Sequence, residues 1–343
     1  MAAVAFARQS VYLPCMVSLT PLETCLAQAL HGTAPVPAEM LGLAAAQGLV
    51  LAEDILLPCD HPVTAEALRA GYAVAALDLV GAGAGNPVPL GAASIVVPGE
   101  ALPAGADAVL PQDGTDATAG LAEAIRPVVP GEGVRRSGHD GRRGDTILRA
   151  GLRLCPRARL VARLAGVETV PVRRPRLHVA LEDARLEAFA SALLRGLGAV
   201  TTDTDPHLSL RPARDHRPRL AFSPAETAWL GKDGSGLVLE VPARFDQAVA
   251  ALLGLALPAM TALAGVSLAL QTRPLSRKVV STVGLTELLL LGGEGGSWHP
   301  QPVGTVTLAG LASATAFALL PPDSEGLPAD RLLAAQPIAH LFG

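Results

Sequence analysis

The stretch 176–198, "RLHVALEDARLEAFASALLRGLG", predicts a short strand followed by an amphipathic helix that ends at Gly196 and Gly198. A second apolar strand, "LVLEVP" at 237–242, precedes a long segment rich in alanine and leucine. Strand and helix therefore alternate between about 175 and 260. Such alternation is typical of an α/β unit.

The alanine-rich segment after this strand must be weighed as a membrane span. Residues 248–271 carry no charge, and a span needs roughly 20 apolar residues. Pro258 lies in the middle of the segment, however, and no second segment of this kind exists. Because proline breaks a helix interior, we expect a buried helix that ends near Pro258 and is followed by a strand, and no membrane contact.

The rest of the chain predicts smaller elements. Residues 18–32 predict a helix with Thr20 as N-cap, Pro21 at its first position and Gly32 as its end, and Pro156 opens another helix. Residues 60–131, rich in Gly, Pro, Val and Ala, predict small β-structure. Four apolar runs after residue 263 predict a last all-β unit, with "GGEGG" at 292–296 as a hairpin turn.

Composition excludes several classes of protein. A chain of 343 residues with 50 % hydrophobic content can form two or more domains. The net charge of −4 and the dispersed arginines argue against a nucleic-acid partner. The four cysteines form no C-x-x-C pair, the "CDH" at 59–61 cannot converge on a metal, and no secretory signal is evident. We expect a cytoplasmic protein with no metal site.

Several motifs follow one another in a specific order. They are "GLVLAEDILLP" (48–58), "LPAGADAVLPQDGT" (102–115), "PGEGVRRSGHDGRRGDTILRAG" (130–151) and "PLSRKVVSTVGLTELLLL" (274–291). As a set, they resemble the molybdopterin molybdenumtransferase family, which includes bacterial MoeA and the E domain of gephyrin. The resemblance extends from about Ser18 to Leu333.

The resemblance implies an elongated, multi-domain α+β architecture. It divides the chain into a linker domain (16–56 with 133–172), a β-rich domain (57–132), a shortened α/β molybdopterin-binding-type domain (173–262) and a C-terminal β domain (263–343). Members of the family are dimers. The motifs of the N-terminal half, where partner contacts are expected, are the better preserved ones, so a homodimer is expected here.

Family members insert molybdenum into adenylylated molybdopterin in the presence of magnesium. This chemistry requires carboxylates for the divalent ion, and amides and cations for the phosphates. The sequence departs from the family pattern at nine such positions, which are Ala65, Ala67, Ala70, Pro98, Ala184, Ser223, Glu226, Ala243 and Arg244. Alanine stands for aspartate at 65, 70 and 184, and can neither bind a cation nor move a proton.

The same departures predict a lost phosphate pocket in the α/β domain. Ser223 and Glu226 stand where the family has two lysines, and Ala243-Arg244 replaces Gly-Asn. A glutamate placed about 4 Å from a phosphate charge would repel it by about 4 kcal/mol at an effective dielectric of 20. Residues 203–222 are also too short to contain a strand and helix that the family has there. We therefore expect this pocket to be dismantled.

One polar cluster of the family pattern remains. In "VRRSGHD", Arg135, Arg136 and Asp140 match it, and Asp113 lies in a neighbouring motif. These four residues are candidate contacts to a substrate or ion. The alternative interpretation is a surface turn with ordinary Arg–Asp pairing, which is common and weak.

Three functions remain open at this point. The first is a catalytically impaired MoeA-like protein that acts in binding or assembly, with a molybdoenzyme or cofactor-biosynthesis protein as its partner. The second is an active transferase that uses relocated acids such as Asp140, Asp113 or Glu226, and only in this case would magnesium and molybdopterin be required. The third is a dimeric interaction module without a cofactor.

Overall fold

The computed structural model describes residues 18–338 except 92, 117–120, 215–216, 235 and 294. The chain forms two compact units. The larger unit holds the described residues up to Glu39, together with Gly48–Ala52 and those from Pro171 onward; the smaller holds Met40–Gln47 and Glu53–Val170. The structure separates into two compact units. The division into four domains that the family resemblance implies therefore stays a prediction.

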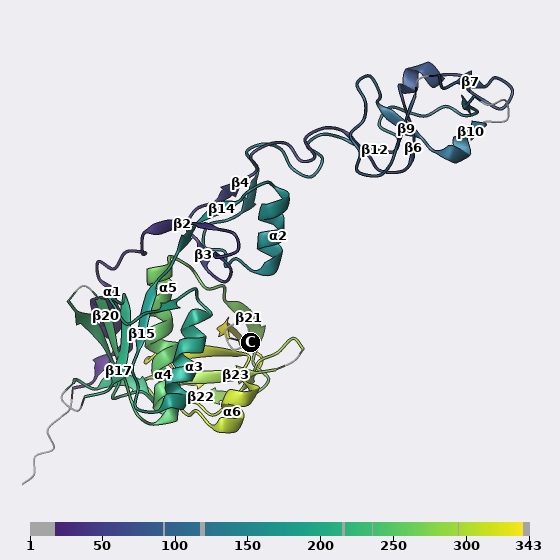
Figure 1. Ribbon diagram of the computed structural model, residues 1–343. Coiled ribbons are helices and arrows are strands. Elements are labelled where there is room, and N and C mark those ends of the chain that lie inside the picture. The colour runs from purple at the N-terminus through teal and green to yellow at the C-terminus, as the bar shows by residue number, and fades with distance from the viewer. Residues whose placement is uncertain are drawn as a thin grey trace, which may run out of the picture. The chain divides into compact units, whose positions relative to one another are not determined.

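The α/β part of the larger unit is built on a five-stranded sheet (Figure 1). The strand order is β16-β15-β17-β20-β19, and all neighbours are parallel except β19 and β20. The strands are β15 (Arg176–Val179), β16 (Val200–Thr201), β17 (Leu208–Pro212), β19 (Trp229–Asp233) and β20 (Gly236–Val241). Helix α3 (Ala184–Arg195) connects β15 to β16, which confirms the strand and helix predicted over 176–198.

The two faces of this sheet differ in chemistry. Leu177, Leu210 and Leu239 point to one face and join a core that also contains residues of α1, α3, α4 and α5. Because side chains alternate along a strand, Arg211 and Glu240 lie on the other face. In the described part of 203–222 the structure has strands but no helix, and arginine side chains contact Glu240 on this second face.

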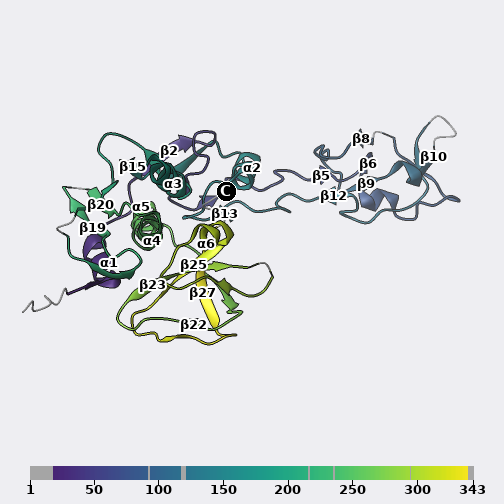
Figure 2. The same cartoon turned by 90° about the horizontal axis from the view of Figure 1, so that it is seen from below.

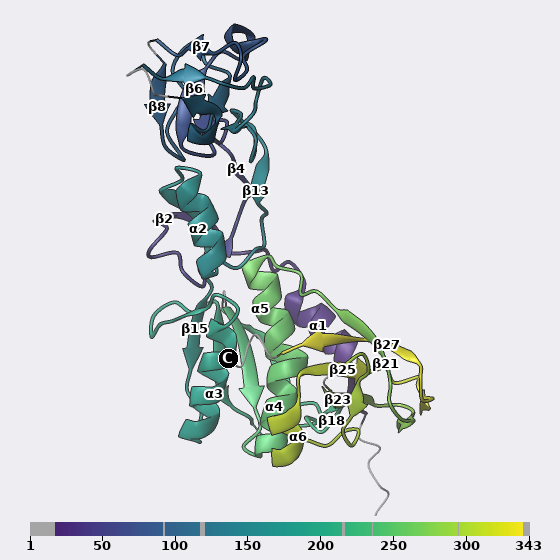
Figure 3. The same ribbon diagram turned by 90° about the vertical axis from the view of Figure 1, so that its right-hand side faces the viewer.

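The long apolar segment forms one continuous buried helix and does not end near Pro258, as expected from the sequence. Helix α4 (Phe245–Ala251) passes through a π-helical turn, Leu252–Ala256, into α5 (Leu257–Ala264) (Figure 3). A π-turn loosens the regular hydrogen-bond ladder just where Pro258 lacks an N–H, so the proline is accommodated. This helix is long and apolar enough to cross a membrane, but 78 % of its apolar window is buried inside the protein.

A second, seven-stranded sheet contains the C-terminal strands (Figure 2). Its path is β1-β18-β23-β25-β27-β21, with β24 paired to β23. The bounds are β1 (Thr20–Pro21), β18 (Leu220–Ser223), β21 (Gln271–Pro274), β23 (Thr286–Gly292), β24 (His299–Pro300), β25 (Ala316–Leu320) and β27 (Leu332–Pro337). Strands β23 and β24 form the hairpin expected around 292–296, where residue 294 lies outside the described residues.

Two local expectations for the larger unit are wrong. Thr20 does not cap the first helix, α1 (Leu22–Leu30); its N–H donates to the carbonyl of Arg219 at 2.8 Å, and it pairs with Leu220 in the sheet. The C-terminal region is not all β, because α6 (Leu308–Ser313) begins after Thr307, whose hydroxyl accepts the N–H of Gly310 at 2.9 Å. Strands β22 (Val279–Val280) and β26 (Gly326–Leu327) complete this region.

The described residues of the smaller unit form short strands, one α-helix and two 3₁₀ turns, and the β-structure predicted over 60–131 is present there. Two three-stranded sheets have the orders β8-β6-β9 and β10-β11-β7, and β12-β5 and β13-β4 form ribbons. The bounds are β4 (Ile55–Leu56), β5 (Glu66–Ala67), β6 (Gly71–Val74), β7 (Val88–Pro89), β8 (Ser94–Val96), β9 (Ala108–Leu110), β10 (Thr115–Asp116), β11 (Glu123–Ala124), β12 (Val134–Arg135), β13 (Thr146–Leu148), α2 (Pro156–Leu164) and the turns η1 (Ala76–Leu79) and η2 (Gln112–Gly114). At the borders of the units lie β2 (Ala38–Gly42), β3 (Val50–Leu51) and β14 (Thr169–Arg173).

Gly71 is required for a different reason from the one the sequence suggests. The motif "GYA" is typical of a turn that leads into a strand, but Gly71 is itself the first residue of β6. A Cβ atom at this position would lie 2.2 Å from the carbonyl oxygen of Leu110 in β9. The glycine is therefore needed because two backbones approach closely, which no other residue permits.

Candidate functional site

Four of the nine positions that depart from the family pattern lie in the smaller unit, and they do not form a polar site. Ala67 is buried among Ala73, Val96 and Val109 in a small apolar core. Ala65 is half-buried, whereas Ala70 and Pro98 are exposed. The alanines at 65 and 70 therefore leave no carboxylate at the positions where the resemblance places magnesium ligands, and the residues present do not fit that ion.

The four candidate contact residues of the smaller unit lie on its surface. Arg135 donates from Nε to Asp140 Oδ1 at 3.2 Å and forms a second, shorter contact from Nη2 to Oδ2. This guanidinium, helped by His139, holds the pKa of Asp140 below its usual value. Arg136 and Asp113 are exposed. Asp140 is thus already neutralised by Arg135, as an ordinary surface pair would be, and a substrate-binding role for these residues remains a prediction.

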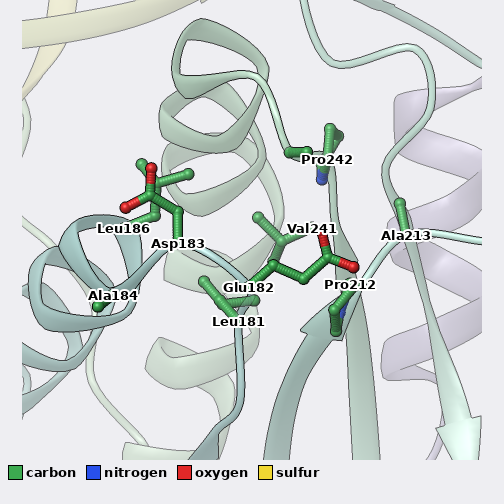
Figure 4. A pocket seen from close by; sticks show the side chains of 10 residues that line it. Leu181, Glu182, Asp183, Ala184, Leu186, Pro212, Ala213, Val241 and Pro242 are labelled. Atoms are coloured by element: carbon green, nitrogen blue, oxygen red, sulfur yellow. The ribbon is translucent and has the colours of Figure 1, made fainter.

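A pocket lies at the carboxyl ends of the parallel strands in the larger unit (Figure 4). Its volume is about 420 Å³, and we call it the strand-end pocket. It is lined by residues 181–184 and Leu186 after β15, by Pro212-Ala213 at the end of β17, and by residues 241–243 at the end of β20. This is the edge of a parallel sheet at which α/β proteins generally bind ligands.

Two carboxylates lie in this pocket in different states. Asp183 caps α3 by accepting the N–H of Arg185 at 2.8 Å, and its pKa is lowered to about 2 by the side chain and backbone of Arg185. Glu182 extends toward Pro212, away from Asp183 (Figure 4). It is exposed and has no ion pair or hydrogen bond with any described side chain. Glu182 is therefore the acceptor that is available to a ligand in the strand-end pocket.

A second pocket adjoins the first and has the opposite charge. It has a volume of about 290 Å³ and shares Ala213, Pro242 and Ala243 with the strand-end pocket. Four arginines line it, so we call it the arginine pocket; they are Arg214, Arg217, Arg219 and Arg244. The expected loss of the family's own phosphate-binding residues stays a prediction, since this cavity is lined by other cations.

Glu240 forms hydrogen bonds with Arg211, Arg214 and Arg217. Its side chain is completely buried, and it accepts from Arg217 at 3.0 Å, from Arg211 at 3.1 Å and from the backbone N–H of Arg214 at 3.2 Å. Burial raises the pKa of Glu240, but the bonds from Arg217 and Arg211 outweigh it, and the pKa lies below the usual value. Arg217 also stacks on the indole ring of Trp229, 3.8 Å from its centroid.

The other five positions that depart from the family pattern lie in the larger unit, and three of them line these pockets. Ala184 and Ala243 line the strand-end pocket, and Ala243 and Arg244 line the arginine pocket. Ser223 lies elsewhere, with its hydroxyl 3.5 Å from the carbonyl of Gly304, and Glu226 lines neither pocket. Glu226 directly precedes Thr227, which lines the arginine pocket, so the repulsion expected from Glu226 stays a prediction.

Sequence reasoning missed Glu182, Asp183 and Glu240, and assigned no role to the arginines between 211 and 219. The acidic pair was detectable, because it falls between a predicted strand and a predicted helix. The convergence of the arginines was not, because it depends on the pairing of Arg211 with Glu240 across β17 and β20. Among the described residues, no group of three or more His, Cys, Asp or Glu could hold a metal ion.

Comparison with known proteins identifies the N-terminal part of the chain. Residues 20–167 match the family described as the MoeA N-terminal region, domains I and II. This part of the chain is similar to the N-terminal region of MoeA proteins. Molybdopterin molybdenumtransferase 2 of Mycobacterium tuberculosis is 33 % identical over 148 residues, 38 % of this chain and 36 % of that protein. The molybdopterin molybdenumtransferase of Synechococcus elongatus is 27 % identical over 157 residues, 40 % of this chain and 39 % of that protein.

The fold of MoeA extends further than these sequence matches. The molybdopterin biosynthesis moeA protein of Pyrococcus horikoshii has a TM-score of 0.73 at 20 % identity and covers 93 % of this chain and 100 % of its own. A molybdenum cofactor biosynthesis protein of Pyrococcus furiosus has a TM-score of 0.59 at 15 % identity, with the same coverage. The multi-domain α+β, MoeA-like fold is thus confirmed, although the chain matches less than two-fifths of the length of these curated relatives in sequence.

Proposed function

We propose that this protein acts in molybdenum cofactor biosynthesis by binding a molybdopterin-type pterin phosphate without inserting molybdenum into it. In this role it is a catalytically impaired member of its type, and it presents or protects the pterin for another protein of the same pathway or for a molybdoenzyme. The pair of oppositely charged pockets at the sheet edge is the observation on which the proposal depends.

The binding part of the proposal follows from the chemistry of the two pockets. A pterin ring carries an amino group and a ring N–H on one edge, and a carboxylate accepts such a pair of donors well. Glu182 offers this carboxylate in the strand-end pocket. The phosphate at the other end of the ligand needs cations, and the adjoining arginine pocket supplies them. Each pocket is of a size typical of part of a small-molecule site.

The loss of transferase chemistry is supported by the residues that replace acids. Ala65 and Ala70 in the smaller unit, and Ala184 in the strand-end pocket, are alanines where the resemblance implies aspartates. A methyl group can hold neither magnesium nor a proton. Asp140, one of the three acids that could have taken over this role, is paired with Arg135. These substitutions leave the shape of a ligand site and remove its reactive groups.

The proposal can be tested with the full chain and adenylylated molybdopterin. We expect binding in a calorimetric titration, and no molybdenum insertion after molybdate and magnesium are added. Glu182→Gln should weaken binding by about tenfold, because one charge-assisted hydrogen bond is lost. Glu325→Gln removes the same charge from an exposed position of the same unit and should change nothing. Turnover would instead establish an active transferase, and absence of binding would favour an interaction module without cofactor.

We further propose that the chain is a cytoplasmic homodimer. The family resemblance supports the dimer, and the described cysteines, Cys25, Cys59 and Cys155, are free thiols, as a reducing compartment allows. Light scattering of the purified chain should give a mass of twice 34.9 kDa over a tenfold range of concentration. A mass of one chain throughout that range would contradict this proposal.

A further inference from the structure

We propose that His207 is a proton-sensitive switch at the amino-terminal edge of the five-stranded sheet: its neutral ring holds the first residue of β15, and its protonated ring releases it. Nδ1 of His207 lies 2.9 Å from the backbone nitrogen of Arg176, at which β15 begins. A backbone N–H can only donate, so Nδ1 must accept, and the neutral ring must carry its proton on Nε2. Protonation of Nδ1 would place two donors against each other and break this bond. The inference does not rest on the proposed function.

The imidazole of His207 takes the place that a backbone carbonyl has in a regular parallel ladder. The N–H of His207 donates to the carbonyl of Arg176 at 2.9 Å, so in a regular ladder the carbonyl of Asp205 would accept the N–H of Arg176. Asp205 instead has a φ of 45°, in the left-handed region, and its carbonyl accepts from Nε of Arg176 at 2.7 Å. The N–H of Arg176 therefore depends on a side chain that can titrate.

His207 connects three neighbouring strands of the sheet. It directly precedes β17, its N–H bonds to Arg176 in β15, and its carbonyl accepts the N–H of Leu237 in β20 at 2.9 Å. Strand β15 leads in turn into residues 181–184, which line the strand-end pocket. Release of Arg176 would therefore loosen the start of the strand that carries one wall of this pocket.

The surroundings of the ring favour its neutral form. Burial lowers the pKa of His207 below its ordinary value of 6.5, and the Arg176 guanidinium lowers it further. The carboxylates of Asp205 and Glu39 act in the opposite direction, but Asp205 pairs with Arg176, and Glu39 pairs with Arg174 at 3.1 Å. The released ring thus takes up a proton at a higher pH than the ring bound to Arg176 does. The bond should accordingly be lost as the pH falls below about 6.5.

Hydrogen exchange at single amides of the full chain tests this switch, with each rate compared with the intrinsic rate at the same pH. In the wild type, protection of the Arg176 amide should fall about tenfold between about pH 7.5 and about pH 5, the equivalent of one lost hydrogen bond. Nitrogen NMR of the His207 ring at about pH 7.5 should show a proton on Nε2 and none on Nδ1. A proton on Nδ1 at this pH, or protection that does not change with pH, would overturn the inference.

Three variants separate the proton on His207 from general effects of acid. His207→Asn offers a carbonyl oxygen close to the position of Nδ1 and cannot titrate, so the Arg176 amide should stay protected at both pH values. His207→Ala removes the acceptor and should lower protection about tenfold at both. His31→Asn removes an exposed histidine of the same unit and should keep the wild-type dependence on pH. A wild-type loss on acidification in His207→Asn, or full protection in His207→Ala, would refute the switch and leave the proposed function intact.

Discussion

Glu240→Ala should lower the free energy of unfolding of the larger unit by about 3 kcal/mol, because it removes the shared partner of two half-buried arginines. The side chains of Arg211 and Arg217 are 25 % and 26 % exposed, and both donate to the fully buried carboxylate. Breaking a buried ion pair costs about 3–5 kcal/mol when the remaining charge stays buried. These arginines can regain some water, so we expect the lower end of that range.

The charge of Glu240 can be separated from its packing by a milder substitution. Glu240→Gln keeps the volume and should cost less than Glu240→Ala, since only the charge is lost. Glu182→Ala is the control, because it removes an exposed glutamate of the same unit that has no ion pair with a described residue. Urea unfolding followed by circular dichroism measures all three. If Glu240→Ala and Glu182→Ala had the same stability, Glu240 would not be a structural anchor.

The cost of Glu240→Gln should also depend on pH in a defined direction. The pKa of Glu240 in the folded protein lies below its ordinary value of 4.5. As the pH falls, the unfolded chain therefore takes up this proton before the folded chain does, and the folded state loses its advantage. The difference in stability between wild type and Glu240→Gln should be constant above about pH 5 and shrink below it. A difference that grew on acidification would contradict the assigned ion pairs.

Sequence patterns predicted correctly those helices and strands that depend on neighbouring residues in the sequence. The strand and helix of 176–198 follow from apolar spacing and from glycines that stop the helix, and both are present. The helix opened by Pro156 is present for the same reason. The expected end of the long helix at Pro258 failed, because the π-turn before it depends on tertiary packing. There, a Cβ on Gly254 would lie 2.6 Å from the ring of Phe222, a residue that is distant in sequence.

The candidate site shows the same limit. Substitutions at Ala184 and Ala243 were visible in the sequence, and both residues do line a pocket. The loss of a phosphate pocket was predicted from Ser223 and Glu226, which stand where the family has lysines, and from Ala243-Arg244, which replaces Gly-Asn. The structure supplies cations from another segment, 214–219, which becomes adjacent only when β17 pairs with β20. Charge that arrives from a neighbouring loop cannot be inferred from position-by-position comparison.

This origin of the cations also explains why the second face of the five-stranded sheet is polar. Helices α1, α3, α4 and α5 share one core with the first face. Glu240 on the second face would be costly to bury without partners, since an isolated carboxylate loses its hydration. The arginines satisfy it and at the same time present their remaining donors outward. The segment that carries Arg211 and Arg217 can therefore both cover a sheet face and create a binding surface.

Gly71→Ala should destabilise the smaller unit by about 3 kcal/mol, the upper range for forcing extra volume into a packed interior. The added methyl group would lie 2.2 Å from Leu110 O, 2.9 Å from Leu110 C and 3.0 Å from Val109 Cγ1. Leu110 and Val109 are completely buried in β9, and β9 pairs with β6 through Tyr72 and Leu110. Backbone atoms held in a strand pair cannot rotate away as a flexible side chain could, so β6 and β9 must separate.

The effect of Gly71→Ala must be measured in the smaller unit, because a chain with two units need not unfold in one step. Hydrogen exchange resolved to peptides should show faster exchange of the β6 and β9 amides in Gly71→Ala, with the amides of β17 and β20 unchanged. Gly85→Ala is the matched control: it lies in the same unit, its added methyl group would meet no atom within 4 Å, and its backbone is not left-handed. It should alter exchange by no more than about 0.5 kcal/mol. Equal protection of β6 in both variants would show that the approach of β6 to β9 is not what selects glycine at position 71.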